Sequence, residues 1–200
     1  MMGAVFSILI VLVVLIVVIV AYGIGCYNRF VEARNAFKNA FSQIEVQLVR
    51  RYDLIPNLLE SVKAYLKHEN ETLTQVTEAR NIAAQGLKKA AASPGDPARM
   101  SQLMQANGAL NSALSRLMLV VEAYPELKAN ETIAQFSKEL ANTENLIAAE
   151  RKIYNDSAMH YNTITQVFPA NIVAGLFHFG QAAFLEAPAE KKEAPKVSFN

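Results

Sequence analysis

The sequence contains a single cysteine, Cys26, and three histidines that lie far apart along the chain. One cysteine excludes an intramolecular disulfide framework and any metal site built from several cysteines. No two histidines are spaced four residues apart, and no glutamate stands three residues before a histidine, so the helical zinc and di-iron patterns are missing as well. The sequence therefore predicts no metal site and no cofactor.

The sequence also lacks the motifs that carry common enzyme chemistry. It has no glycine-rich phosphate loop and no nucleophile elbow. Its 19 basic and 18 acidic side chains nearly balance, which argues against a nucleic-acid-binding protein with a basic stripe. Alternating β-branched runs and hairpin turn pairs are missing too, so strands are not expected. We predict an all-α protein that is neither an enzyme nor a binder of nucleic acid.

Charge is missing from the first 28 residues, and the first charged side chain is Arg29. Residues 8–21 are all Ile, Leu, Val or Ala, and the apolar character extends from Ala4 to Tyr22. About 19 helical residues cover roughly 28 Å, which is close to the hydrocarbon thickness of a bilayer. The segment therefore predicts a membrane-spanning helix, with membrane lipid as its partner.

The residues around Cys26 allow two interpretations of this segment. A secretory signal needs a basic start and a shorter apolar core, and a lipoprotein site needs a small-residue pattern that Gly23, Ile24 and Gly25 match only next to the cysteine. An uncleaved single-pass anchor in the inner membrane is favoured, and an exported lipoprotein acylated at Cys26 is the alternative. Arg29, Arg34 and Lys38 follow the span, so the positive-inside rule places the N-terminus outside and the remaining chain in the cytoplasm.

Beyond the anchor, apolar residues recur at helical spacing in four segments. The first runs from about Tyr27 to Lys67, and its apolar phase survives Pro56, which predicts one continuous helix with an interior proline. The second covers about residues 69–92. Asp96 as N-cap and Pro97 at the first helical position start the third, which extends to about residue 123. The fourth runs from about Pro125 to Phe168 with a regular seven-residue repeat of Ile133, Leu140, Ile147, Tyr154, Tyr161 and Phe168.

Four amphipathic helices joined by short turns predict a long antiparallel up-down bundle. The expected organisation is an anchor (1–26), a helical bundle (27–168), an apolar membrane-proximal segment (169–187) and an extended tail (188–200). The second and third helices are too short to reach the membrane, so Phe37, Tyr154 and Tyr161 are expected to stay partly uncovered on the stalk formed by the first and fourth helices. Exposed apolar stripes mark association, so homo-oligomer contacts are expected there.

The fourth helix should return to the bilayer, which places the segment after it at the headgroups. Ile172, Leu176 and Phe177 make this segment apolar enough for contact with lipid or with a second copy. Packing on the chain's own helices is the alternative.

Polar residues also fall on predicted core faces. Arg51 and Arg80 lie on the inner stripes of the first two helices, and Glu144 and Glu150 lie on or beside the second seam of the fourth. Because a buried lone charge is costly, we expect Arg51 or Arg80 to pair with Glu144 or Glu150. Such a layer sets helix register more often than it carries catalysis. Asp53 and Asn57 are expected to pair with the backbone groups that Pro56 frees.

Several stretches closely resemble the LemA family of bacterial membrane proteins. They are QLVRRYDLIPNLLESVKAYLKHE (47–69), LANTENLIAAERKIYNDSAMHYN (140–162), FPANIVAGLFHF (168–179) and PKVSF (195–199). The resemblance implies an N-terminal anchor or lipobox, a long helical bundle, and no established activity or cofactor. One family member is associated with forming magnetosome membranes, which implies membrane shaping by analogy.

Two functions follow as hypotheses. The first is a membrane-anchored helical scaffold that self-associates and organises the membrane. The second is an interaction module that presents its bundle, or the distal tip at residues 63–74, to an unidentified protein partner.

Overall fold

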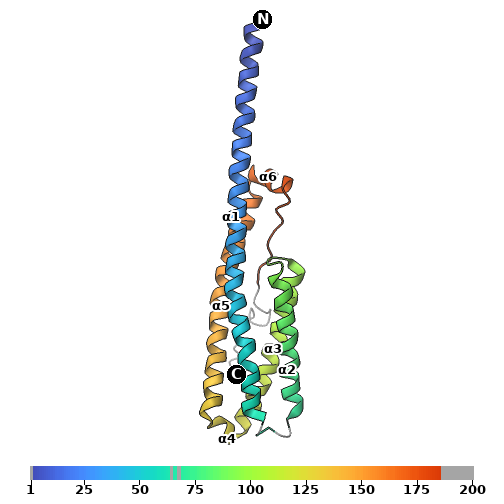
Figure 1. Ribbon diagram of the computed structural model, residues 1–200, viewed down its shortest axis with the longest axis vertical. Coiled ribbons are helices and arrows are strands. Elements are labelled where there is room, and N and C mark those ends of the chain that lie inside the picture. The colour runs from blue at the N-terminus through green and yellow to red at the C-terminus, as the bar shows by residue number, and fades with distance from the viewer. Residues whose placement is uncertain (1, 64, 67–68, 186–200) are drawn as a thin grey trace, which may run out of the picture.

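The computed structural model describes residues 2–63, 65–66 and 69–185 (Figure 1). These residues form the helices α1 (Met2–Lys63), α2 (Asn70–Ala91), α3 (Pro97–Ala123), α4 (Pro125–Lys128), α5 (Glu131–Gln166) and α6 (Ala170–Leu176). The described part of the chain contains no strand, so the all-α prediction is confirmed. The predicted extended tail (188–200) and part of the distal tip lie outside the described residues.

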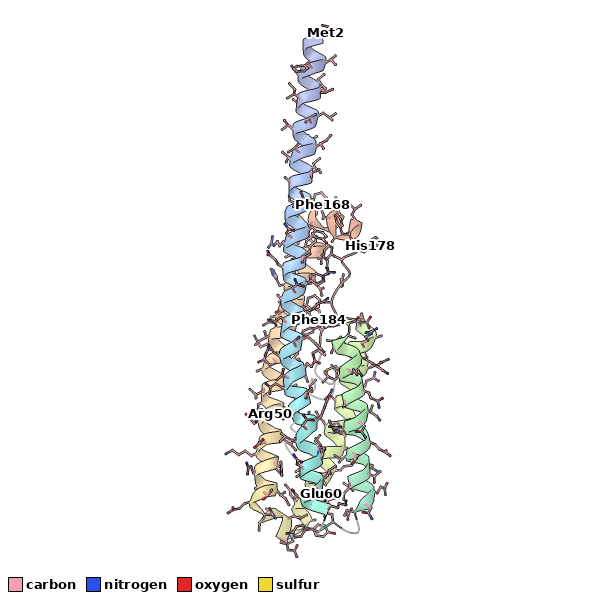
Figure 2. All side chains as sticks on the ribbon, viewed as in Figure 1. Met2, Arg50, Glu60, Phe168, His178 and Phe184 are labelled. Carbon is pink, nitrogen blue, oxygen red and sulfur yellow. The ribbon has the colours of Figure 1, made fainter. Side chains whose placement is uncertain are left out.

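Helix α1 runs without a break through the apolar span, Cys26 and Pro56. Among the described residues it is the one helix long and apolar enough to cross a membrane, and no part of its apolar window is buried against other elements. Figure 2 shows the side chains of this part standing clear of the rest of the molecule, from Met2 downward. The predicted continuity across Pro56 is confirmed, and the helix ends four residues earlier than predicted, at Lys63.

The remaining helices lie beside the lower part of α1 in two packed pairs. α1 packs along α5, α2 packs along α3, and α1 also contacts α2. In Figure 1 the chain reverses its direction from α1 to α2, from α2 to α3, and from α3 to α5. The two shorter helices, α2 and α3, accompany only the distal part of the α1–α5 pair.

Local sequence explains where these helices begin and end. Asp96 accepts a hydrogen bond from the Arg99 backbone N–H at 2.9 Å, so the predicted cap of α3 is confirmed. The predicted fourth helix divides into α4 and α5, because Asn130 caps a new helix by accepting from the backbone N–H of Thr132 at 3.0 Å. At its other end α5 stops at Gln166, three residues before Pro169.

The core follows the predicted seven-residue repeat of the fourth segment. Its first five members are buried: Ile133, Leu140, Ile147, Tyr154 and Tyr161. Phe168, the sixth, is 80% exposed because it lies beyond the end of the helix. The apolar stripe of the first segment is buried in the same way as far as Val62, whereas Tyr65 lies after the helix end and is largely exposed.

After α6 and a turn at Phe177 and His178, the chain forms neither helix nor strand, and we call residues 178–185 the strap. In Figure 1 the strap descends from α6 to the upper end of the α2–α3 pair. There the Ala183 N–H donates to the Gly95 carbonyl at 2.9 Å. Gly95 has a φ of +89°, and a β-carbon at this position would lie 3.2 Å from Ala182 and from Phe37. Glycine thus lets the α2–α3 turn approach the strap closely.

Candidate functional site

The predicted polar layer is centred on Arg51 of α1. Its guanidinium lies 2.8 Å from the Glu144 carboxylate of α5 and donates to the Asn111 side-chain oxygen of α3. Arg51 is 7% exposed, so burial lowers its pKa, while the Glu144 charge acts in the opposite direction. The predicted Arg51–Glu144 pair is present in the structure, and it ties three helices together at one level.

Glu150 does not belong to this layer. It makes no ion pair with any residue that the structure describes. The neighbouring residue, Arg151, is the half-buried one: burial lowers its pKa, Glu144 counteracts the effect, and Arg51 adds to it. Arg151 stands seven residues after Glu144 on α5, which puts both on the same helical seam. That spacing was available in the sequence and could have identified Arg151.

Arg80 acts at a different place from the one predicted. Its Nε–H donates to the backbone carbonyl of Tyr52 at 3.0 Å, and its guanidinium lies 3.6 Å from Asp53. Pro56 has no N–H, so the Tyr52 carbonyl lacks the bond that a continuous helix would supply four residues on. Of the two arginines from which a partner for Glu144 or Glu150 was expected, Arg51 is the one that pairs, and Arg80 lies outside the layer. Arg80, rather than Asp53 or Asn57, supplies the missing donor.

Tyr52 itself faces inward next to Arg51. Its hydroxyl donates to the Asn107 side-chain oxygen at 2.9 Å, and the Asn107 amide donates to the Leu103 carbonyl at 3.0 Å. Burial raises the pKa of Tyr52 to about 12. The bonds from Tyr52 and Arg51 to α3 extend the polar layer from the α1–α5 pair to the other helix pair.

An open groove lies beside this layer, between α3 and α5. Its volume is about 640 Å³, and Arg51, Asn111 and Glu144 form its polar end. The other lining residues are Leu114, Ser115, Met118, Leu119, Glu122, Ser137, Leu140 and Ala141. No group of three or more metal-ligating side chains occurs among the described residues. The groove is therefore lined for an apolar or extended ligand with a charged group, rather than for a metal ion.

The stalk is the part of the α1–α5 pair that lies between the α2–α3 pair and the apolar span. Phe37, Tyr154 and Tyr161 are 3%, 0% and 2% exposed within a single chain, so the expectation that they stay uncovered is wrong. The physical reason is the strap, which lies where a third helix would be needed. Tyr154 and Tyr161 donate to the carbonyls of Ala183 and Gly180 at 2.7 and 2.8 Å. Burial raises the pKa of both hydroxyls.

Two asparagines of α5 hold the strap backbone in place. The Asn162 side chain accepts from the Ala182 N–H at 2.8 Å and donates to the Ala182 carbonyl at 2.9 Å. Asn155 binds Leu185 in the same two-way manner, at 2.8 and 3.0 Å. Sequence reasoning missed these residues, although each follows a seam tyrosine and the two Tyr-Asn pairs stand seven residues apart.

The segment after α5 presents an apolar surface next to the end of the span. Ile172, Leu176 and Phe177 are 63%, 73% and 52% exposed. On the opposite side α6 packs on the chain through Ala170 and Ala174, so packing on its own helices accounts for only part of this segment. The Phe177 ring meets the Tyr27 ring edge-on at 5.1 Å between centroids. In Figure 2 the labelled Phe168 and His178 lie at the level where the bare part of α1 ends.

The C-terminal end of α5 also lies at this level. This is the position expected for a fourth helix that runs back toward the apolar span. Cys26 is half-buried there, in a cavity of about 480 Å³ between α1 and the C-terminal end of α5. Arg29, Thr163 and Val167 line the same cavity. Cys26 thus marks the boundary at which the helical domain meets the apolar span.

Comparison with known proteins agrees with this architecture and with the quoted motifs. A family model described as the LemA family matches residues 40–199. The chain belongs to the LemA family. It is 30% identical over 165 residues to Protein LemA of Metamycoplasma hominis, covering 82% of this chain and 70% of that protein. It is also 27% identical to Magnetosome protein MamQ 2 of Paramagnetospirillum magneticum, covering 94% of this chain and 75% of that protein. Three features of this LemA-family chain stand out in its structure: the exposed face of α6, the strap and the α3–α5 groove.

Proposed function

We propose that the protein is a non-enzymatic, single-pass membrane-anchored scaffold whose four long helices form one antiparallel bundle on the cytoplasmic side. The observation that carries this proposal is the exposed apolar face of α6, formed by Ile172, Leu176 and Phe177, at the level where the apolar part of α1 ends. This face would rest in the interface of the bilayer and orient the bundle against the membrane. The likeness to a protein named for the magnetosome supports a role in organising a membrane.

The contacts around α6 suit a membrane interface. The rings of Tyr27, Phe30, Phe177 and Phe179 form an edge-on aromatic cluster. The Arg34 guanidinium lies 4.9 Å from the centre of the Phe179 ring, which is a cation–π arrangement. Aromatic and basic side chains are typical of the zone in which apolar and aqueous phases meet. An apolar helix face in that zone gains stability when it is buried among lipids.

The polar layer supports a structural role rather than catalysis. The half-buried carboxylate of the layer, Glu144, forms an ion pair with Arg51, and Arg80 donates to the backbone of its neighbouring helix. Charged groups fixed in this way set the register of helices. We therefore infer that the polar layer stabilises the bundle.

Self-association takes a different place from the one expected from the sequence. Because the stalk aromatics are buried within one chain, a second copy would meet the exposed face of α6 rather than Phe37, Tyr154 or Tyr161. Lipid is the first candidate for this face because the apolar span ends at the same level. A second copy is the alternative partner.

A fluorescent reporter distinguishes lipid from protein at this face. The chain contains no tryptophan, so Phe177→Trp introduces a single probe. In vesicles with lipids brominated on their acyl chains, we expect blue-shifted emission that the bromines quench. The matched control is Tyr65→Trp at the far end of the bundle, which should be neither shifted nor quenched. Emission from Phe177→Trp that the bromines leave unchanged would overturn the lipid contact, and concentration-dependent emission would favour a second copy.

The orientation needs its own test. Protease added to spheroplasts should leave the bundle intact if it lies in the cytoplasm, with a cytoplasmic protein as the control for lysis. Digestion of the bundle would show that it is exported and would restore the interpretation of Cys26 as an acylation site. An uncleaved span and an acylated Cys26 would both place the membrane boundary near Cys26. The Phe177→Trp experiment therefore keeps its meaning in either case.

The second hypothesis, an interaction module, draws its support from the α3–α5 groove. An apolar groove with a charged end is a common form of peptide-binding site. A partner can enter the groove only if no segment of the chain itself occupies it.

A further inference from the structure

The α3–α5 groove continues the path of the strap. Leu185, the last described residue, lines a small cavity together with Arg51, Arg151, Asn111 and Glu144. Three of these residues, Arg51, Asn111 and Glu144, also form the polar end of the larger groove. Leu185 therefore lies beside the polar end of the groove.

The strap advances along α5 at a constant rate. Ala182 is held by Asn162 and Leu185 by Asn155, so three strap residues correspond to seven helical residues. Three extended residues span about 10 Å, and seven helical residues rise by about 10.5 Å. Because the two rises match, an extended chain can follow the groove without slack. Ala141, fourteen residues before Asn155 on the same side of α5, lines the groove.

The Tyr-Asn pairs that hold the strap stop where buried arginines begin. Seven residues before Tyr154 and Asn155, α5 carries Ile147 and Ala148, which offer no hydrogen bonds from their side chains. One turn before Asn155 stands Arg151. Its Nε–H and that of Arg51 are buried and have no hydrogen-bond partner among the residues that the structure describes.

Charge at this level is unbalanced. Two guanidinium groups, of Arg51 and Arg151, line the small cavity with the carboxylate of Glu144. The next residue of the chain after Leu185 is Glu186. A buried charge without a partner is expensive, and a carboxylate that accepts hydrogen bonds from guanidinium groups removes that cost. The sequence thus provides a carboxylate directly after the end of the strap.

We propose that the α3–α5 groove is a binding site for an extended peptide that begins with a carboxylate side chain, and that its occupant is the chain's own C-terminal segment, residues 186–200. The Glu186 carboxylate pairs with Arg151 and Arg51, and the following residues lie along Leu114, Met118 and Leu140. The segment is 15 residues long and reaches about 50 Å when extended, which is more than the length of the groove requires. A partner that enters this groove must displace the segment.

Proteolysis of the full chain in detergent tests the proposal. Trypsin can cut the segment at Lys191, Lys192 and Lys196, and the released fragments are counted by mass spectrometry. Each rate is divided by that of a free peptide of residues 183–200 with the same substitution. We expect the wild-type segment to be cut at least about tenfold more slowly than the peptide, a factor that one charge-assisted hydrogen bond supports.

The variants separate Glu186 from the other acidic residues. Glu186→Gln should raise the normalised rate about tenfold, whereas the matched control Glu193→Gln, which removes the same charge farther along, should change it less than about twofold. Arg151→Gln should act like Glu186→Gln, and the double variant should add nothing to either. Glu186→Gln leaves every described helix residue unchanged, and circular dichroism verifies the fold of the Arg151 variant.

Three results would overturn the proposal. Cleavage of the wild-type segment at the peptide rate would leave the groove to another partner. Equal effects of Glu186→Gln and Glu193→Gln would remove the specific ion pair. Protection that rises with protein concentration would show that the segment binds a second copy rather than its own groove.

Discussion

The α1–α5 seam is buried by different structural elements in the stalk and in the distal bundle. In the distal bundle, helices α2 and α3 cover the seam, and the cover leaves a groove. In the stalk, an extended strap covers it, and side chains of α5 hold the strap backbone. Within the strap one backbone hydrogen bond runs from the Gly180 N–H to the His178 carbonyl, so most of its backbone groups need partners from outside. The comparison shows that a regular heptad seam determines what is buried but leaves open what buries it.

The largest effect is expected from the stalk, where Tyr154 fills the space under the strap. Tyr154→Ala removes a fully buried ring and should lower the free energy of unfolding by about 4 kcal/mol, measured by denaturant unfolding in detergent. Tyr154→Phe keeps the ring, loses the bond to the Ala183 carbonyl and should cost about 1 kcal/mol. Equal losses in the two variants would show that the hydrogen bond, and not the packing, holds the strap.

The asparagine clamp is expected to have the next largest effect. Asn162→Ala leaves both the N–H and the carbonyl of Ala182 without their partner and should cost about 3 kcal/mol. Hydrogen exchange at Ala182 should accelerate in parallel. Asn145→Ala, an exposed asparagine on the same helix, is the control and should stay within about 0.5 kcal/mol of the wild type. A similar loss in both variants would contradict a specific clamp.

Tyr52 of the distal bundle should contribute to a loss of stability at high pH. The pKa of Tyr52 is raised to about 12, so folding favours the neutral hydroxyl. The contribution is complete below pH 10 and is lost as the pH rises from 10 to 12, because the unfolded chain ionises first. Tyr52 should contribute roughly 2–3 kcal/mol to the fall in the free energy of unfolding over this range, and Tyr154 and Tyr161 of the stalk, whose pKa values are also raised, add to that fall. Tyr52→Phe should show a correspondingly smaller fall, and an unchanged pH profile would refute the assignment.

The smallest effect is expected at the proline of α1. Arg80→Met removes the donor to the Tyr52 carbonyl and should cost about 1–2 kcal/mol. In a Pro56→Ala background the helix supplies its own donor at this carbonyl, so the same change should cost less than about half as much. Additive losses in the double variant would mean that Arg80 acts through Asp53 alone.

The sequence predicted the helices because their signals are local. Apolar spacing, the Asp96 cap and the phase maintained across Pro56 define the helices before any tertiary contact is known. Asn130, whose side chain caps α5, lies between the expected helix start at Pro125 and the first residue of the apolar repeat, Ile133, so the apolar pattern alone predicts one helix through it.

The site was predicted only where both partners lie on periodic helices. Arg51 and Glu144 each occupy a seam, so their pairing followed from periodicity and charge. The partner of Arg80 is a backbone carbonyl, and the strap has no periodicity, so neither could be deduced from side-chain spacing. The burial of Phe37 depended on that strap as well.

Because α1 is uninterrupted, a tilt of the proposed membrane span would be transmitted directly to the bundle. About 40 residues of the helix extend past the apolar span, which corresponds to a lever of about 60 Å. A membrane-spanning helix tilts when the hydrocarbon thickness differs from its own apolar length. Because no break uncouples the two parts of α1, a tilt of about 10° displaces the distal end by about 10 Å. In the proposed anchored state, the position of the distal end of the protein therefore depends on the thickness of the bilayer.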